Sequence, residues 1–83
     1  MALKIQWTED ARADIRALDR STAMWIFEVL HRYALTGAGD VKSLKGRYEG
    51  LSRLRLGDYR LIFDVDGSLL RILYVRHRSR AYR

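Results

Sequence analysis

The stretch Leu51–Arg76, LSRLRLGDYRLIFDVDGSLLRILYVR, contains three strand-like segments separated by two short turn signals. The first turn signal is Gly57-Asp58, and the second is Asp66-Gly67, a pair that favours a two-residue hairpin. Each segment between them is rich in apolar or alternating residues. The pattern predicts antiparallel strands that follow one another as a meander, over residues 51–56, 59–65 and 68–76.

A further strand and two helices are predicted ahead of this meander. Residues 3–7 alternate apolar and polar side chains, the period-two pattern of a strand with one buried face. Thr8, followed by two acidic residues, begins the first helix. Asp19 or Ser21 caps the second helix, which ends near Gly37 and carries so many apolar residues that we expect it to be largely buried.

The segment between the second helix and the meander is predicted to be irregular. Residues 41–50 carry three cations and two glycines but little apolar sequence. The predicted order is therefore β-α-α-β-β-β, an α+β fold in which two helices pack on one face of a small antiparallel-dominated sheet. A chain of 83 residues is too short to divide its core, so we expect a single domain over residues 1–83.

Positive charge is concentrated in the second half of the chain. Residues 42–83 contain 11 Lys or Arg against 4 Asp or Glu, whereas residues 1–41 contain 5 against 6. Arg accounts for 13 of the 16 cations, and its forked guanidinium suits recognition of phosphate oxygens. A one-sided basic surface of this kind predicts nucleic acid as a partner.

The composition also disfavours several classes of site. The chain has no cysteine, which excludes disulfides and thiolate metal ligands. Asp58, Asp64 and Asp66 are typical of turns and surfaces, so neither a metal site nor a cofactor is predicted. No apolar run approaches the roughly 18 residues of a membrane span, and the first residues are too polar for a signal peptide, so we expect a cytoplasmic protein without membrane association.

Three arginines of the meander are the first candidate functional residues. Arg53 and Arg55 are two residues apart in a predicted strand, so their side chains share one face of the sheet. Arg60 interrupts an otherwise apolar segment, where a charge is costly unless it faces solvent or a ligand. Two interpretations remain open: solubilising residues on an exposed face, or residues that bind anionic oxygens. The number of arginines favours binding, with Arg60 as the leading candidate.

The last residues, 76–83, place a histidine and a tyrosine among arginines. Such a terminus is either a solvated, frayed end or part of a site. Cleavage of RNA by its own ribose 2′-hydroxyl needs a proton acceptor, a proton donor and cations that neutralise the extra negative charge. His77 can donate or accept a proton. Tyr82 either releases its proton with the help of neighbouring cations or stacks on a base.

The chain resembles the RelE/ParE toxin superfamily in three stretches, LKG at 44–46, GLSRLRLGDYRLIF at 50–63 and HRSRAY at 77–82. Within it, the chain is most similar to RelE-like toxins of bacterial type II toxin-antitoxin systems. The resemblance implies a microbial-RNase-like sheet and a metal-independent endoribonuclease, an mRNA interferase that cleaves in the ribosomal A site and so inhibits translation. It also implies as partners a cognate antitoxin, messenger RNA on the ribosome, and operator DNA bound by a toxin-antitoxin hetero-oligomer.

The same resemblance assigns roles to individual residues. Arg60 matches the arginine that stabilises the scissile phosphate, and Tyr82 matches the terminal catalytic tyrosine. The remaining acid position falls on one of three neighbouring residues, Arg76, His77 or Arg78. The basic residues that would bind RNA phosphates are Lys45, Arg53, Arg55 and Arg80. Some members carry two lysines where this chain has Leu51 and Arg53, and an arginine rarely loses the proton that a general base must release.

Two other functions compete with the nuclease. The first is a ParE-like inhibitor of DNA gyrase that uses the same fold without cleaving RNA. Such relatives generally lack the terminal basic residues and tyrosine, so His77, Arg78 and Tyr82 favour the nuclease. The second is an inactive relative that only binds nucleic acid, or that joins its antitoxin in repressing their operon.

Overall fold

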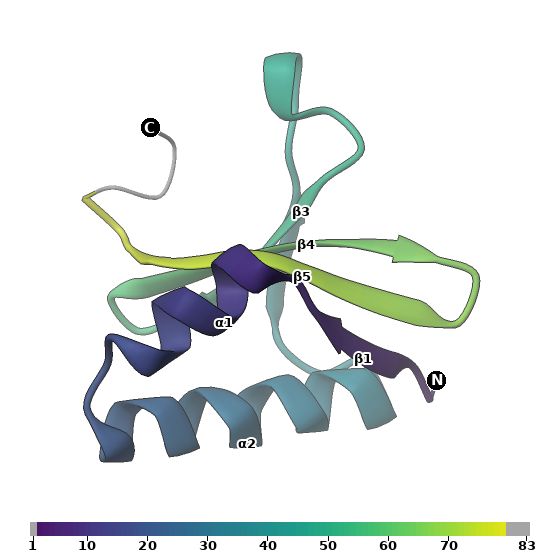
Figure 1. Ribbon diagram of the computed structural model, residues 1–83. Helices are drawn as coiled ribbons and strands as arrows, with labels where there is room; N and C mark the ends of the chain where they lie inside the picture. The colour runs from purple at the N-terminus through teal and green to yellow at the C-terminus, as the bar shows by residue number, and fades with distance from the viewer. Residues whose placement is uncertain (1, 80–83) are drawn as a thin grey trace.

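The computed structural model describes residues 2–79 and contains one five-stranded sheet with two helices. The strands lie in the order β1-β5-β4-β3-β2; β1 is parallel to β5, and the other neighbours are antiparallel. Figure 1 shows both helices on one side of the sheet. The elements are β1 (Lys4–Trp7), α1 (Glu9–Arg16), α2 (Arg20–Thr36), β2 (Asp40–Ser43), the short 3-10 helix η1 (Gly46–Tyr48), β3 (Ser52–Leu56), β4 (Tyr59–Asp66) and β5 (Leu69–His77).

The α+β class, the two helices and the meander are confirmed, but the sheet has one strand more than predicted. β2 pairs antiparallel with β3, within the segment that was predicted to be irregular. Val41 is its only apolar residue and packs against the core, so a strand of four residues gives too little alternation to recognise. The remainder, through η1, is a loop closed by a hydrogen bond from Leu44 N to Leu51 O (2.9 Å).

Both predicted helix starts are present. The Thr8 hydroxyl accepts a hydrogen bond from Ala11 N at the start of α1 (3.2 Å). Asp19, and not Ser21, caps α2, and Ser21 instead donates its hydroxyl proton to the Asp19 carboxylate (2.6 Å). α2 ends at Gly37, whose φ of 78° is left-handed and therefore favours glycine.

The Asp19 cap predicts a pH-dependent contribution to stability. Hydrogen bonds from the Ser21 hydroxyl, the Thr22 hydroxyl and Thr22 N lower the pKa of Asp19 from 3.8 to about 2. A carboxyl whose pKa falls on folding stabilises the protein above its unfolded pKa, and this contribution is lost as the pH falls through the folded pKa. We therefore expect Asp19→Ala to lower the thermal midpoint at neutral pH, with a deficit that shrinks below pH 3.8.

Circular dichroism melts at successive pH values measure this deficit. Asp19→Asn is the matched control, because an amide oxygen still accepts the hydrogen bond from Thr22 N but does not titrate. The difference in thermal midpoint between Asp19→Asn and Asp19→Ala should stay constant over the pH range in which the difference between wild type and Asp19→Ala shrinks. An Asp19→Ala deficit that is unchanged down to pH 2 would contradict the titrating cap.

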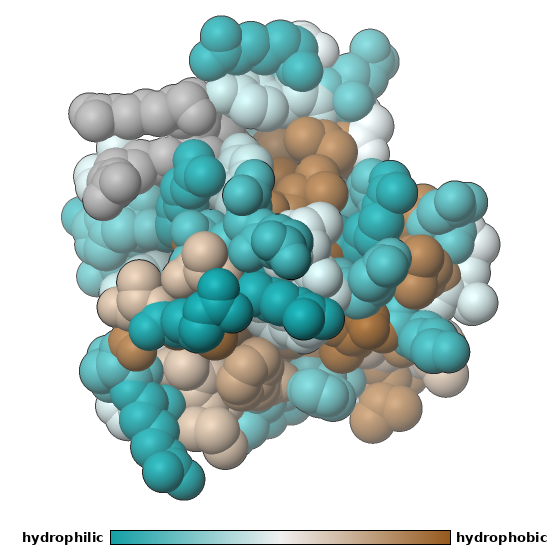
Figure 2. All heavy atoms as spheres, in the orientation of Figure 1, coloured by the Kyte–Doolittle hydropathy of each residue, from teal (hydrophilic) through white to brown (hydrophobic). Residues whose placement is uncertain are grey.

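The core lies between the sheet and the helices, and α2 contributes only one stripe to it. Ile26, Leu30 and Ala34 are four residues apart and buried, whereas Trp25 and Leu35 are 41% and 65% exposed. The prediction of a largely buried α2 is therefore wrong, because the sheet covers only one face of this helix. Figure 2 shows hydrophobic side chains reaching the surface in its lower half, where α2 lies in Figure 1.

Candidate nucleic-acid interface

Three arginines from three strands lie side by side on the face of the sheet opposite the helices. Arg55 is paired in register with Arg60, and Arg60 with Arg76. Directly paired residues share a face, with Cβ atoms about 4.5–5.5 Å apart. The residues next to them in sequence, Leu54, Leu61 and Val75, belong to the core, so these arginines point away from it. We call Arg55, Arg60 and Arg76 the arginine row.

A β-bulge in β5 decides which C-terminal residue joins this row. The register with β4 shifts between Ile72 and Tyr74, which leaves Leu73 as an extra residue. A bulge of this kind moves the alternation of the following side chains by one position. Ile72 and Val75 therefore both belong to the core although they are three residues apart, and Arg76 lies on the outer face.

His77 and Arg78, the other two residues predicted for the acid position, lie elsewhere. His77 is opposite Tyr59 on the helix side of the sheet, with ring centroids 5.7 Å apart and an interplanar angle of 85°. Arg78 follows the strand; its N–H donates to Asp58 O (2.7 Å), and its Nε is 3.8 Å from Asp58 Oδ1. The sheet thus brings Arg76 to Arg60, and it does not bring His77.

The arginine row has little internal charge compensation. Arg60 Nη1 donates to the carbonyl oxygens of Gly57 and Tyr59, both at 3.0 Å, which holds the side chain near the turn between β3 and β4. Within residues 2–79, neither Arg55 nor Arg60 forms an ion pair with an acid. Like charges directly opposite one another destabilise a sheet, so an anion bound between them offsets this cost.

A second row of the same face carries Arg53, one of the residues predicted to bind phosphate. Arg53 is paired with Lys42 on β2 and with Ile62 on β4. Ile62 is fully buried, but it does not belong to the core between the sheet and the helices. Arg53 Nη2 donates to Asp40 Oδ1 (3.3 Å), and its side chain is only 16% exposed. Its Nε is buried without a hydrogen-bond partner in the described part of the chain, where a bound oxygen would satisfy it.

The other predicted site residues lie in the β2–β3 loop and the C-terminal tail. Lys45 is exposed and immediately precedes η1. Arg80 and Tyr82 lie outside the described residues. Within residues 2–79, no three His, Asp or Glu side chains are grouped so as to hold a metal ion.

Asp14 is a residue of this region that sequence reasoning missed. It belongs to α1 and lines a cavity of about 340 Å³. The remaining residues that line this cavity are Ala17, Leu18, Tyr59, Val75, Arg76 and His77. Asp14 lies in the last turn of α1, where the helix dipole disfavours a negative charge. That unfavourable position was the one signal in the sequence that this carboxylate has a partner elsewhere.

The family comparison covers almost the whole chain. The profile of the ParE toxin of the type II toxin-antitoxin system parDE matches residues 5–82. No curated protein matches the chain. No helix in the described part of the chain is long and apolar enough to cross a membrane.

Solved toxin-antitoxin complexes share this fold. A chain of the RelBE2 complex from Mycobacterium tuberculosis is 27% identical with a TM-score of 0.78, and the match covers 94% of this chain and 100% of that chain. A chain of the archaeal RelE-RelB complex from Pyrococcus horikoshii is 26% identical with a TM-score of 0.77, over 98% and 100% of the two chains. A chain of the YoeB-YefM complex from Staphylococcus aureus, 22% identical over 93% and 98%, has the same fold with a TM-score of 0.74.

Proposed function

The chain belongs to the ParE toxin family of type II toxin-antitoxin systems, within the RelE/ParE superfamily, and on this premise we propose that it acts by ribosome-dependent cleavage of messenger RNA. The arginine row carries this proposal. Three guanidiniums from adjacent strands form a surface that suits a phosphodiester. The sequence resemblance to RelE-like toxins supports RNA as the polymer and the ribosomal A site as the place of cleavage.

The proposed reaction is transfer of the phosphoryl group to the neighbouring 2′-hydroxyl. The 2′-oxygen bonds to phosphorus, the bond from phosphorus to the 5′-oxygen breaks, and the products are a 2′,3′-cyclic phosphate and a 5′-hydroxyl. Arg60 and Arg55 neutralise the additional negative charge of the transition state. One proton leaves the 2′-hydroxyl and one reaches the departing 5′-oxygen.

The proton transfers are assigned within the set of residues that the resemblance gives as catalytic. An arginine side chain does not exchange its proton in proteins, so we assign Arg76 charge stabilisation. His77 is on the opposite side of the sheet from Arg60, so we leave it outside the reacting group. We assign both proton transfers to Tyr82, the residue that the resemblance makes the catalytic tyrosine, which takes the proton from the 2′-hydroxyl and returns it to the departing 5′-oxygen. We assign the flanking phosphates to Lys45, Arg53, Arg78 and Arg80.

A reconstituted translation reaction tests this function. Messenger RNA is incubated with the protein in the presence and absence of ribosomes, and cuts are mapped by primer extension. We expect cuts in phase with the codons that need ribosomes and leave a 5′-hydroxyl. Intact messenger RNA on programmed ribosomes at saturating protein would overturn the proposal.

A second candidate function is inhibition of DNA gyrase, which the match to the ParE family profile favours. A supercoiling assay with purified gyrase distinguishes the two. Inhibited supercoiling with intact messenger RNA would establish the gyrase function. Salt-sensitive RNA binding with neither effect would indicate a binding module, because each phosphate contact releases counterions.

We also propose that a cognate antitoxin masks the arginine row. Two matched chains above 25% identity, those of the RelBE2 and archaeal RelE-RelB structures, come from complexes with an antitoxin. An acidic segment of the antitoxin would neutralise the arginines and cover the phosphate surface. The resulting hetero-oligomer would bind operator DNA, and the whole system would work in the cytoplasm, where its ribosomal target is.

A further inference from the structure

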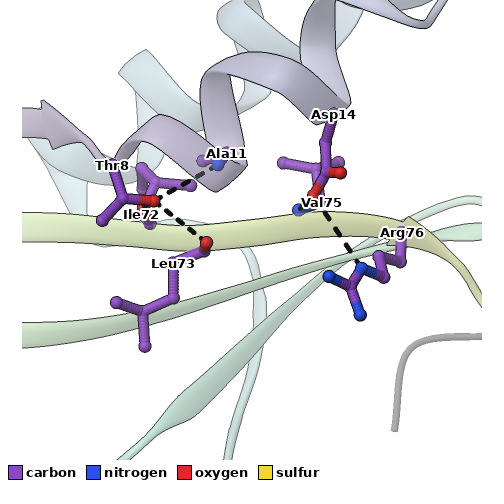
Figure 3. A network of polar contacts seen from close by, with 7 residues as sticks. All are labelled: Thr8, Ala11, Asp14, Ile72, Leu73, Val75 and Arg76. Atoms are coloured by element: carbon purple, nitrogen blue, oxygen red, sulfur yellow. Dashed lines mark hydrogen bonds and ion pairs between the residues drawn. The ribbon is translucent and has the colours of Figure 1, made fainter. Parts of the chain in front are cut away.

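One edge of β5 is only half covered by a strand. β1 pairs with β5 from Leu69 to Ile72, whereas β5 continues to His77. An edge without a partner leaves backbone N–H and C=O groups unsatisfied. In this protein α1 and its cap supply the missing partners, as Figure 3 shows.

Two side chains replace the missing strand. Thr8 Oγ1 lies 2.8 Å from the carbonyl oxygen of Ile72 and 3.0 Å from that of Leu73. Asp14 Oδ2 accepts a hydrogen bond from Val75 N (2.9 Å). The bond to the backbone fixes the Asp14 carboxylate at the edge of the strand, one residue before Arg76.

The fixed carboxylate also meets Arg76. Asp14 Oδ2 is 3.9 Å from Arg76 Nε, and the Arg76 Cζ lies 4.4 Å from the centroid of the Tyr74 ring. The Arg76 guanidinium therefore lies between the Asp14 carboxylate, which Figure 3 shows, and the ring of Tyr74 on the outer face. The Asp14 side chain is 25% exposed and the Arg76 side chain 34%, so water screens this pair less than a fully exposed pair.

Arg76 differs in this respect from the other members of the arginine row. In the described part of the chain it alone among them forms an ion pair with an acid. The contact uses Nε and leaves the two terminal nitrogens of Arg76 to reach a phosphate. Without the carboxylate, repulsion from Arg60 favours rotamers that carry Arg76 away from the row.

We propose that Asp14 is a positioning residue that fixes Arg76 in the arginine row before the substrate binds. Charged groups that are already in place when charge develops stabilise a transition state without a cost of reorganisation at that moment. The effect on cleavage rests on the proposed nuclease function. The positioning itself is a property of the free protein and is measured separately.

The variants separate the two contacts of Asp14. Asp14→Asn keeps an oxygen that accepts from Val75 N but removes the charge that holds Arg76, whereas Asp14→Ala removes both. Asp64→Asn is the matched control, because Asp64 pairs with Arg71 on the same face but outside the row. We expect Asp14→Asn to unfold at nearly the wild-type temperature, and Asp14→Ala at a lower one.

Kinetics on programmed ribosomes test the consequence for cleavage. Asp14→Asn should lower kcat about tenfold with little change in KM, and Asp64→Asn should leave both unchanged. In an Arg76→Ala background, Asp14→Asn should have no further effect, because the residue that it positions is absent. An equal loss of kcat in both backgrounds, or no loss in either, would overturn the proposal.

Nuclear magnetic resonance of the free protein tests the positioning without reference to cleavage. The order parameter of the Arg76 Nε–H bond should exceed that of Arg55 in the wild type and fall in Asp14→Asn. An Arg76 value unaffected by this substitution overturns the inference. A wild-type protein that cleaves nothing but shows the expected order parameters defeats the proposed nuclease function and supports the positioning.

Discussion

Arg60→Ala is expected to lower the maximal rate of messenger cleavage by about 100- to 1000-fold, the usual cost of removing one preorganised group that stabilises transition-state charge. Arg60 is the central member of the arginine row, paired in register with Arg55 on one side and Arg76 on the other. A phosphate held between these strands therefore meets Arg60 whichever neighbour it also contacts. Arg60→Lys should have an intermediate rate, because lysine keeps the charge but not the fork of donors.

The matched control for Arg60→Ala is Arg71→Ala. Arg71 is on the same face, but it donates from Nε and Nη2 to the two oxygens of Asp64 at 2.9 and 2.6 Å. These hydrogen bonds raise the pKa of Arg71 above its ordinary value and commit its guanidinium to the carboxylate. We expect Arg71→Ala to cleave nearly as fast as wild type. Equal rates for wild type and Arg60→Ala, both confirmed as folded by circular dichroism, would remove Arg60 from the mechanism.

The outer face was predictable from sequence wherever the strands alternate regularly. Arg53 and Arg55 alternate with Leu54 and Leu56 in β3, so the period of two was enough to place them together on the face opposite the core. The pairing of Arg55 with Arg60 follows from the short Gly57-Asp58 turn, which sets the register of β3 and β4. These features depend only on neighbours in the sequence.

The C-terminal part of the site was not predictable in this way. Strict alternation from Ile72 would turn Arg76 toward the core, and the bulge at Leu73 reverses this assignment. The spacing of the apolar residues Leu70, Ile72 and Val75 is the trace that the bulge leaves in the sequence. Without the location of the bulge, the sequence leaves Arg76, His77 and Arg78 as equivalent candidates for the acid position.

Contacts between segments that are distant in the sequence could not be predicted either. The hydrogen bond from Val75 N to Asp14 joins residues 61 positions apart, and its existence depends on where β1 stops pairing with β5. The exposure of Trp25 on α2 has the same kind of cause. An apolar helix is buried only as far as its neighbours extend, and the sheet covers a single face.

Phe63→Ala is expected to lower the free energy of unfolding by about 3–5 kcal/mol, the usual range for truncation of a buried phenylalanine. Phe63 is 1% exposed on the core face of β4, and its ring centroid is 5.5 Å from that of Tyr33 on α2. A domain of this size has a total stability of roughly 4–12 kcal/mol. The variant should therefore lose about half of its stability, measured by urea denaturation followed by circular dichroism.

Val65→Ala is the control on the same strand, because Val65 is 48% exposed and its truncation leaves no cavity. It should change the free energy of unfolding by less than about 0.5 kcal/mol. A Phe63→Ala loss no larger than that of Val65→Ala would show that the helices are not held to the sheet through this contact.

The loss of stability in Phe63→Ala and the loss of cleavage rate in Arg60→Ala should be separable, because the two residues lie on opposite faces of β4. Phe63 points toward the helices and Arg60 points away from them, so one substitution removes packing and the other removes charge. In urea near its unfolding midpoint, Phe63→Ala should have a smaller folded fraction than wild type, while each folded molecule keeps its arginine row and its rate of cleavage. Arg60→Ala should do the reverse. A partner that binds only the folded state, such as the antitoxin, should therefore restore the folded fraction of Phe63→Ala by mass action but leave the lost rate of Arg60→Ala unchanged.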